Sequence, residues 1–229
     1  MTLKVILFDY DGVLVNSFPN IHKVYQIICQ QLGRKCPTDL ETFRKIYGYS
    51  YVELRKNLNI PPEEYTEVER IYREEILKQQ PPLFEGIKEV IQTLSQHYTL
   101  ILLSNNVKEE VLPKLTHFGL LPYFKKIIAE DENYLGKTES ILQLMKEFSL
   151  ASDQIVFIGD RDIDYDLATK AGLKHIILVE YGWGYSKEKL DYNPLVLIKK
   201  PQDLLEAIDR IEPSQNSKKE RVSTHLKLD

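Results

Sequence analysis

The feature that most constrains this chain is a short apolar run, residues 3–8, that stops at two acids. A β-branched run of that length predicts a buried central strand. Asp9 and Asp11 follow it, and Gly12 allows a sharp turn there. Ligands bind at the carboxyl edge of open α/β sheets, and two neighbouring acids are costly there unless a cation or a phosphate uses them. A turn with two solvated carboxylates would explain the pair alone, so the interpretation depends on the rest of the chain.

The length and composition are those of an ordinary globular protein. The 229 residues are 43% hydrophobic and 28% charged, which suits one full core and a smaller insert. The net charge of -4 gives no support to nucleic-acid binding, and no stretch reaches the roughly 18 apolar residues of a membrane span. Cys29 and Cys36 are too few and too loosely spaced for a disulfide framework, which favours a reducing compartment. We expect a cytoplasmic protein without nucleic-acid or membrane partners, of undetermined oligomeric state.

The segment 17–80 carries helical periodicity and no strand pattern. Ile21, Val24 and Ile28 fall on one helical face. Further helices are expected around 40–47, 50–58 and 62–79. The segment therefore predicts a small all-helical unit inserted after the first strand, here called the cap.

From residue 83 onward, strand and helix patterns alternate, which indicates βαβ units and a parallel sheet. Asn106 is the expected N-cap of one helix, and Pro113 is expected to kink or end it. We predict an α/β protein with a doubly wound parallel sheet, a Rossmann-like core. The expected strands are 99–103, 126–129, 154–158, 175–179 and 196–198; the core comprises 1–16 and 81–212, the cap 17–80, and a disordered polar tail 213–229.

Polar residues follow three of the predicted strands. Asp9 and Asp11 follow the first, Ser104 and Asn105 another, and Asp160 a third, with Asp164 beyond it. Parallel strands present their carboxyl ends at one edge, so these groups can converge. Lys137 follows a glycine and opens a helix, where the backbone N–H groups already favour an anion. Acids for a hard cation and donors for phosphate oxygens together indicate phosphoryl transfer.

These segments, in this order, resemble the signature segments of the haloacid dehalogenase-like hydrolase superfamily, in the branch similar to phosphoglycolate phosphatases. The matching residues are Asp9-Tyr10-Asp11-Gly12-Val13-Leu14, Ser104-Asn105, Lys137, and Gly159-Asp160 with Asp164. Each segment alone is weak, but the ordered set is specific and runs from the first strand to about residue 180. Ala171-Gly172 and Gly182-Trp183-Gly184 also resemble that branch.

The resemblance implies an aspartyl-phosphate mechanism. Asp9 would attack the phosphate, and Asp11 would protonate the leaving oxygen and then activate water. The implied Mg²⁺ ligands are the Asp9 side chain, the Asp11 backbone carbonyl and Asp160. The remaining implied roles are orientation of the metal's waters or of Lys137 by Asp164, and stabilisation of the phosphate oxygens by Ser104, the Asn105 backbone and Lys137.

Three functions are compatible with these residues. The leading hypothesis is a Mg²⁺-dependent phosphatase of a small phosphorylated metabolite. A dehalogenase needs no proton donor for its halide, so Asp11 favours phosphate esters. A phosphomutase would use the same aspartyl-phosphate, and a non-catalytic regulatory protein could retain the fold.

The helical insert resembles the mobile cap of that superfamily, which would close over the substrate and exclude water, so specificity is expected to reside there. Substrate contact by His22 is the less favoured interpretation of that residue, and Trp183 is expected to serve packing rather than the pocket rim. Candidates for contact with the leaving group surround Gly48, although solvated helix faces explain them equally well: Arg44, Lys45, Tyr47, Tyr49 and Arg55.

Overall fold

The computed structural model describes residues 2–48, 50–184 and 196–211. Its centre is a six-stranded parallel sheet with the order β3-β2-β1-β4-β5-β6. The first strand of the chain therefore lies in the middle of the sheet. The strands are β1 Val5–Phe8, β2 Thr99–Val107, β3 Phe124–Glu130, β4 Ile155–Gly159, β5 His175–Val179 and β6 Val196–Ile198.

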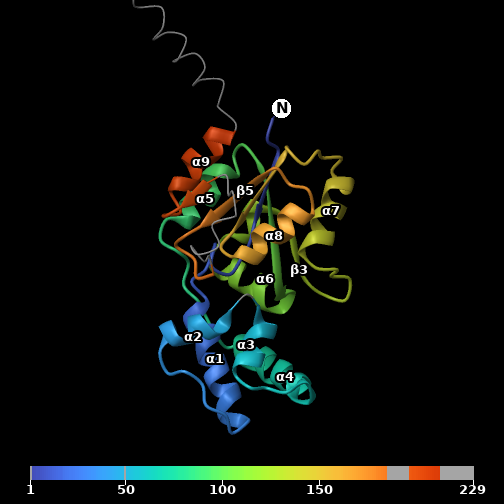
Figure 1. The fold of residues 1–229 in the computed structure, drawn as a ribbon. Helices are drawn as coiled ribbons and strands as arrows, with labels where there is room; N and C mark the ends of the chain where they lie inside the picture. Colours follow the sequence, from blue (N-terminus) through green and yellow to red (C-terminus); the bar gives the residue numbers. More distant parts are fainter. Residues whose placement is uncertain (1, 49, 185–195, 212–229) are drawn as a thin grey trace, which may run out of the picture.

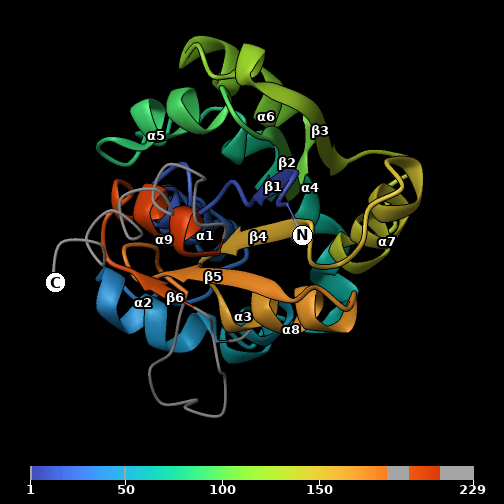
Figure 2. The same cartoon turned by 90° about the horizontal axis from the view of Figure 1, so that it is seen from above.

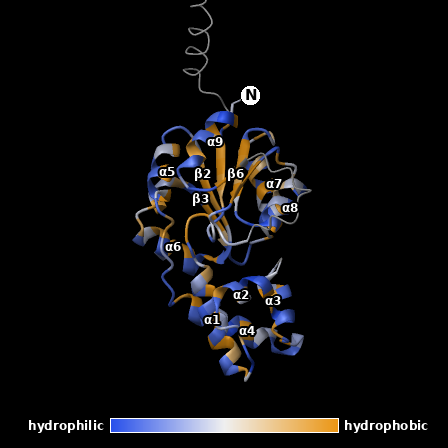
Figure 3. Ribbon diagram, turned by 60° about the vertical axis from the view of Figure 1, so that its left-hand side comes forward, coloured by the Kyte–Doolittle hydropathy of each residue, from blue (hydrophilic) through white to orange (hydrophobic). Residues whose placement is uncertain are grey.

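Helices cover both faces of the sheet (Figure 2). One face packs against α5 (Ile87–Leu94), α6 (Lys108–His117) and α9 (Asp203–Ile211). The other packs against α7 (Lys137–Glu147) and α8 (Asp162–Lys170). This three-layer arrangement confirms the predicted doubly wound α/β fold. The strands are apolar in Figure 3, whereas the outer faces of the helices are mostly hydrophilic.

The sequence of β1 explains its central position. Ile6 and Phe8 belong to the hydrophobic cluster on one face, and Val5 and Leu7 to the cluster on the other. All four side chains are buried. A strand with apolar residues on both faces is stable only between two layers of helices, as in other parallel sheets.

The chain between β1 and α5 forms a helical unit, here called the cap. It contains α1 (Phe18–Gln31), α2 (Leu40–Tyr47), α3 (Tyr51–Asn57) and α4 (Tyr65–Ile76), after a short 3₁₀ helix η1 at Pro62–Glu64. The cap lies beyond the carboxyl ends of the strands (Figure 1). The described part of the cap contains no strand, as the sequence predicts. The helix predicted over 62–79 is shorter than expected, because it begins as a 3₁₀ turn and its α-helical part ends at residue 76.

One local prediction in the core is wrong, and another is excluded in one of its two alternatives. Asn106 is not a helix N-cap but belongs to β2, and Val107 precedes α6 instead. The side chain of Asn106 donates to Asp11, a partner distant in sequence that local capping rules do not consider. Pro113 does not end α6, which continues to His117.

Other predictions remain untested. The predicted tail 213–229 lies outside the described residues. The domain limits stay predictions. No helix among the described ranges combines the length and the apolar character that a membrane span requires.

Candidate active site

The register of the central strands brings the first acid and the downstream acids to one edge. Phe8 pairs with Leu102 of β2 and with Ile158 of β4. The next residue, Asp9, donates its backbone N–H to the Ile158 carbonyl at 2.9 Å. Asp160 begins the loop after β4, so its carboxylate starts from the same edge as that of Asp9.

Lys137 forms two buried ion pairs in this region. Its Nζ lies 2.6 Å from Asp9 Oδ2 and 2.8 Å from Asp164 Oδ1. Lys137 is the first residue of α7, after Gly136 at φ +91°. Its side chain is only 4% exposed, so the ammonium depends on these carboxylates for compensation of its charge.

Asp160 has one satisfied and one unsatisfied oxygen. Its Oδ2 accepts the backbone N–H groups of Trp183 at 2.9 Å and Gly184 at 3.2 Å. Its Oδ1 is buried and has no hydrogen-bond partner among the described residues. A buried carboxylate oxygen without a donor is costly unless a ligand satisfies it, and a cation would do so.

Two glycines make room for this carboxylate. A Cβ on Gly12, which has φ +73°, would lie 2.0 Å from Asp160 Oδ2. A Cβ on Gly182 would lie 2.4 Å from Asp160 Cβ and 2.6 Å from the Gly12 carbonyl oxygen. The turn after β1 and the loop after β5 therefore approach Asp160 so closely that side chains are excluded.

Asp11 lies on the turn after β1 and faces β2. Its Oδ2 accepts the Asn106 side-chain amide at 2.8 Å. Ser104 is buried, and its Oγ accepts the backbone N–H of Asn106 at 3.1 Å. The side chain of Asn105 accepts a hydrogen bond from the Tyr134 hydroxyl at 2.5 Å.

Burial of several acids at one place changes their proton affinities. Burial raises the pKa of Asp9 to about 7, an effect that the Lys137 ammonium opposes only in part. Burial also raises the pKa of Asp160 well above its ordinary value, and the charges of Asp164 and Asp9 raise it further. Burial raises the pKa of Asp11 as well, although the hydrogen bond from Asn106 acts to lower it.

The same surroundings act on the pKa of Lys137. Burial lowers the pKa of Lys137, but the carboxylates of Asp164 and Asp9 raise it by more, so its pKa lies above the ordinary value. Lys137 therefore keeps its charge. The Arg161 guanidinium also acts on these acids, so two cationic side chains face the three carboxyl groups of Asp9, Asp160 and Asp164.

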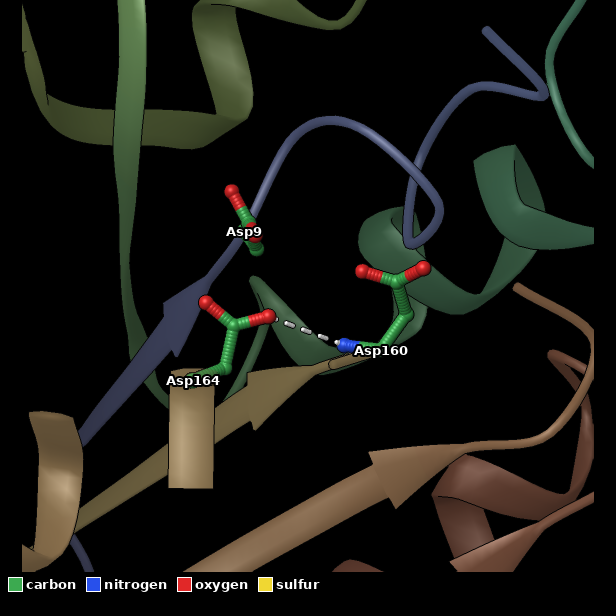
Figure 4. A group of neighbouring side chains, drawn as sticks. All are labelled: Asp9, Asp160 and Asp164. Atoms are coloured by element: carbon green, nitrogen blue, oxygen red, sulfur yellow. Dashed lines mark hydrogen bonds between the residues drawn. The ribbon is translucent and has the colours of Figure 1, made fainter. Parts of the chain in front are cut away.

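The acidic residues fit a divalent cation. Oxygens of Asp9, Asp160 and Asp164 lie within 4.8 Å of one another (Figure 4). Both oxygens of Asp164 are already engaged: Oδ1 by Lys137, and Oδ2 by the backbone N–H groups of Asp160 at 3.3 Å and Arg161 at 3.1 Å. The carboxylate of Asp9 is engaged as well, Oδ1 by the Tyr10 backbone N–H at 2.7 Å and Oδ2 by Lys137. Asp160 Oδ1 is thus the one oxygen of these three side chains without a donor among the described residues.

The predicted leaving-group contacts of the cap lie in different environments. The rings of Tyr47 and Trp183 are in contact beside the site, with centroids 5.1 Å apart. Lys45 pairs with Glu41 on the surface. Three further candidates occupy other environments: Arg44 lies over the Phe18 ring, Arg55 is buried and pairs with Glu69, and Tyr49 lies outside the described residues.

The structure shows where His22 and Trp183 lie. His22 is buried, and its Nε2 lies 2.7 Å from the Pro37 carbonyl oxygen, so its contacts are within the cap. Trp183 is buried in the cap's hydrophobic cluster, which confirms its predicted packing role.

Sequence reasoning missed two residues of the site. Asn106 was assigned to a helix terminus, although its position two residues after Ser104 on an extended strand could have indicated the same edge. Arg161 follows Asp160 directly, and its guanidinium lies over both the Tyr47 ring and the Trp183 ring. No sequence pattern signals that contact, because its three members come from distant segments.

A model of the haloacid dehalogenase-like hydrolase family matches residues 6–178. The chain belongs to this family. The match confirms the resemblance that the ordered segments predict. Members of the family with similar sequences include a phosphorylated carbohydrates phosphatase from Thermotoga maritima, 23% identical over 91% of this chain and 100% of that protein.

Two further proteins are similar to this one over most of its length. A phosphoglycolate phosphatase from Rhodobacter capsulatus is 27% identical over 82% of this chain and 89% of that protein. A haloacid dehalogenase-like hydrolase from Streptococcus pneumoniae has a similar solved structure, with a TM-score of 0.79 and 25% identity over 90% of this chain and 98% of that one.

Proposed function

We propose that this protein is a Mg²⁺-dependent phosphatase that hydrolyses a small phosphorylated metabolite through an aspartyl-phosphate at Asp9. The observation that carries the proposal is the buried Asp9–Lys137 ion pair next to Asp160, whose Oδ1 has no partner within the described part of the chain. The names of the relatives support a phosphomonoester as substrate, either a phosphorylated carbohydrate or phosphoglycolate.

In the first step, a carboxylate oxygen of Asp9 attacks the phosphorus atom. A new P–O bond to Asp9 forms as the P–O bond to the leaving group breaks, and the leaving oxygen takes a proton from Asp11. The raised pKa of Asp11 suits a group that must carry a proton into this step. The Asn106 amide holds the Asp11 side chain in place at 2.8 Å.

In the second step, water attacks the same phosphorus atom. Asp11 takes a proton from this water, the P–O bond to Asp9 breaks, and inorganic phosphate leaves. Lys137 remains beside Asp9 throughout and compensates negative charge on the transferring oxygens, together with Ser104 and the Asn105 backbone N–H.

Asp9, the Asp11 backbone carbonyl and Asp160 would hold the Mg²⁺, while Asp164 fixes Lys137. When bound, the ion offsets the negative charge of the phosphate and the acids as they come together. This role agrees with the raised pKa of Asp9, because a nearby cation favours the ionised form that attack requires.

The test is a panel of phosphomonoesters assayed with Mg²⁺ for release of inorganic phosphate. Asp9→Asn should abolish turnover, whereas Asp209→Asn on the exposed side of α9 is the matched control and should leave it unchanged. A hydroxylamine-labile phosphoprotein should form with the wild type and not with Asp9→Asn.

Other outcomes favour the alternatives. Equal activity in Asp9→Asn would contradict the mechanism. Isomerised sugar phosphate without free phosphate would identify a phosphomutase, and the absence of turnover on the whole panel would favour a non-catalytic protein.

A further inference from the structure

Trp183 lies on a loop of the core, but its side chain packs against the cap. It follows β5, yet its side chain is 7% exposed within the cap's hydrophobic cluster. Its ring stacks on Phe18 at 4.8 Å between centroids and meets Tyr47 edge-on at 5.1 Å. The indole N–H has no hydrogen-bond partner in the described part of the chain, so these ring contacts hold the side chain.

The backbone of the same residue contacts the acid site. The N–H groups of Trp183 and Gly184 donate to Asp160 Oδ2, which leaves Oδ1 as the oxygen without a donor among the described residues. A Cβ on Gly182 would clash with Asp160 and with the Gly12 carbonyl oxygen, so this loop packs directly on both. The same residue, Trp183, thus carries a ring that packs on the cap and an N–H that donates to Asp160.

Arg161 makes a second connection of the same kind. Its backbone N–H donates to Asp164 Oδ2 at 3.1 Å. Its guanidinium carbon lies 5.1 Å from the Tyr47 ring centroid and 5.2 Å from that of Trp183, which are cation–π distances. Its Nη2 also donates to the Gly48 carbonyl of the cap at 3.5 Å.

We propose that Trp183 and Arg161 are positioning residues that link the seating of the cap to the orientation of Asp160. Phe18 and Tyr47 on the cap pack against Trp183, and Tyr47 and Gly48 contact Arg161. These contacts keep the loop donors on Asp160 Oδ2 and leave Oδ1 directed to the cation. When the cap lifts, the Trp183 ring loses both aromatic partners and the donors lose their restraint.

The link works in both directions. If the seated cap favours cation binding, the cation must favour the seated cap by the same factor. The inference rests on the proposed function only in assigning Asp160 to a cation. It can therefore be tested without substrate turnover.

The chain provides its own reporter, because Trp183 is its only tryptophan. Mg²⁺ should change the emission of Trp183 in a saturable way, and calorimetry gives the Mg²⁺ dissociation constant directly. Tyr47→Leu removes the ring that contacts both positioning residues but keeps apolar volume. We expect it to raise that constant about tenfold, in the range for residues that orient metal ligands.

Two variants separate this link from general weakening of the cap. Tyr47→Phe keeps the ring and should bind Mg²⁺ as the wild type does. Phe43→Leu removes a buried ring that packs on Phe18 and Tyr47, with no ring contact to Trp183 among the described residues, and it should leave the Mg²⁺ affinity within about twofold. Arg161→Gln repeats the test from the core side if Tyr47→Leu does not fold.

Several results would overturn the inference. Wild-type Mg²⁺ affinity in folded Tyr47→Leu and Arg161→Gln would do so, as would an equal loss of affinity in Phe43→Leu. So would an Arg161→Gln effect limited to the KM of substrates with a second anionic group, because Arg161 would then bind substrate. If the substrate panel shows no turnover, the calorimetric comparison still decides the link, since it needs only the cation.

Discussion

The ammonium of Lys137 lies 2.6 Å from Asp9 Oδ2, although the two residues are 128 positions apart in the chain. The second carboxylate on Lys137, that of Asp164, also receives two backbone N–H groups of the loop after β4. The lysine is thus held from one side by a fixed carboxylate and faces Asp9 on the other. The Asp9 carboxylate is held by the backbone as well, because its Oδ1 accepts the Tyr10 N–H at 2.7 Å. Lys137 is therefore fixed between two anchored carboxylates.

Replacement of Lys137 by Met should remove both activity and stability. Loss of a buried donor to the transferring oxygens should lower kcat by about 10²- to 10³-fold. Two buried carboxylates lose their counter-ion, which should cost about 3–5 kcal/mol of unfolding free energy at neutral pH. Urea unfolding and phosphate release measure the two effects. Lys146→Met, exposed on the same helix, should change neither, and a fully active Lys137→Met would contradict the assignment.

Gly12 should be irreplaceable for a steric reason beyond its backbone angle. Gly33 has a similar φ, +65° against +73°, but a Cβ added there would meet no atom of a non-adjacent residue within 4 Å. Gly33→Ala should therefore cost only the left-handed strain, about 1–2 kcal/mol. Gly12→Ala adds the clash with Asp160, so it should destabilise more and abolish Mg²⁺ binding by calorimetry. Equal behaviour of the two variants would show that the turn can relax away from Asp160.

Asp11→Asn should produce a loss of activity that depends on the leaving group. A proton donor contributes about 10²- to 10⁴-fold for an alkyl ester, and much less when the departing oxygen is a weak base. We expect a larger drop in kcat/KM for an alkyl phosphate than for p-nitrophenyl phosphate. The Asn side chain retains an oxygen that can accept from Asn106, so the fold should persist. The same drop for both substrates would argue against proton donation by Asp11.

Glu110 should make stability depend on pH. This residue of α6 is buried and pairs with Lys114 at 2.8 Å. Burial, and then the charge of Asp11, raises its pKa from 4.5 to about 7 against the effect of Lys114. The folded state therefore binds more protons than the unfolded state between these values, and the free energy of unfolding from Glu110 falls as pH rises from 4.5 to about 7.

Glu110→Gln should flatten that part of the profile. Relative to the value below pH 4.5, the wild type should lose up to about 3 kcal/mol more than the variant by pH 8. Other acids contribute equally to both proteins, so the difference isolates Glu110. Glu109→Gln, exposed at the next position, should follow the wild type. Parallel wild-type and Glu110→Gln curves would mean that Glu110 stays ionised across this range.

The sheet and its acidic edge could be predicted because local patterns determine them. The apolar run before Asp9 and the run before Asp160 each form a buried strand, and parallel pairing then brings the two acids together. Lys137 joins them because its helix begins beside that edge. The chemical roles of these residues stay predictions until the variants are measured.

The errors arose where a distant partner overrides a local preference. Asparagine is a preferred N-cap residue. Asn106 instead lies on β2, where its side chain donates a hydrogen bond to Asp11, 95 positions away. The contact of Arg161 with the rings of Tyr47 and Trp183 depends on how the cap sits on the core. Helical periodicity predicts the cap helices and contains no information about that placement.

The central place of β1 also sets the order in which a newly made chain can assemble. Strand β1, which precedes Asp9, is synthesised before its two neighbours in the sheet, which begin at Thr99 and Ile155. Helices α1 to α4 find most of their contacts with one another and can collapse early, because their partners are close in sequence. Asp9 and Asp160 can therefore come together only after residue 160 has been synthesised, and the cap cluster gains its last aromatic member, Trp183, later still.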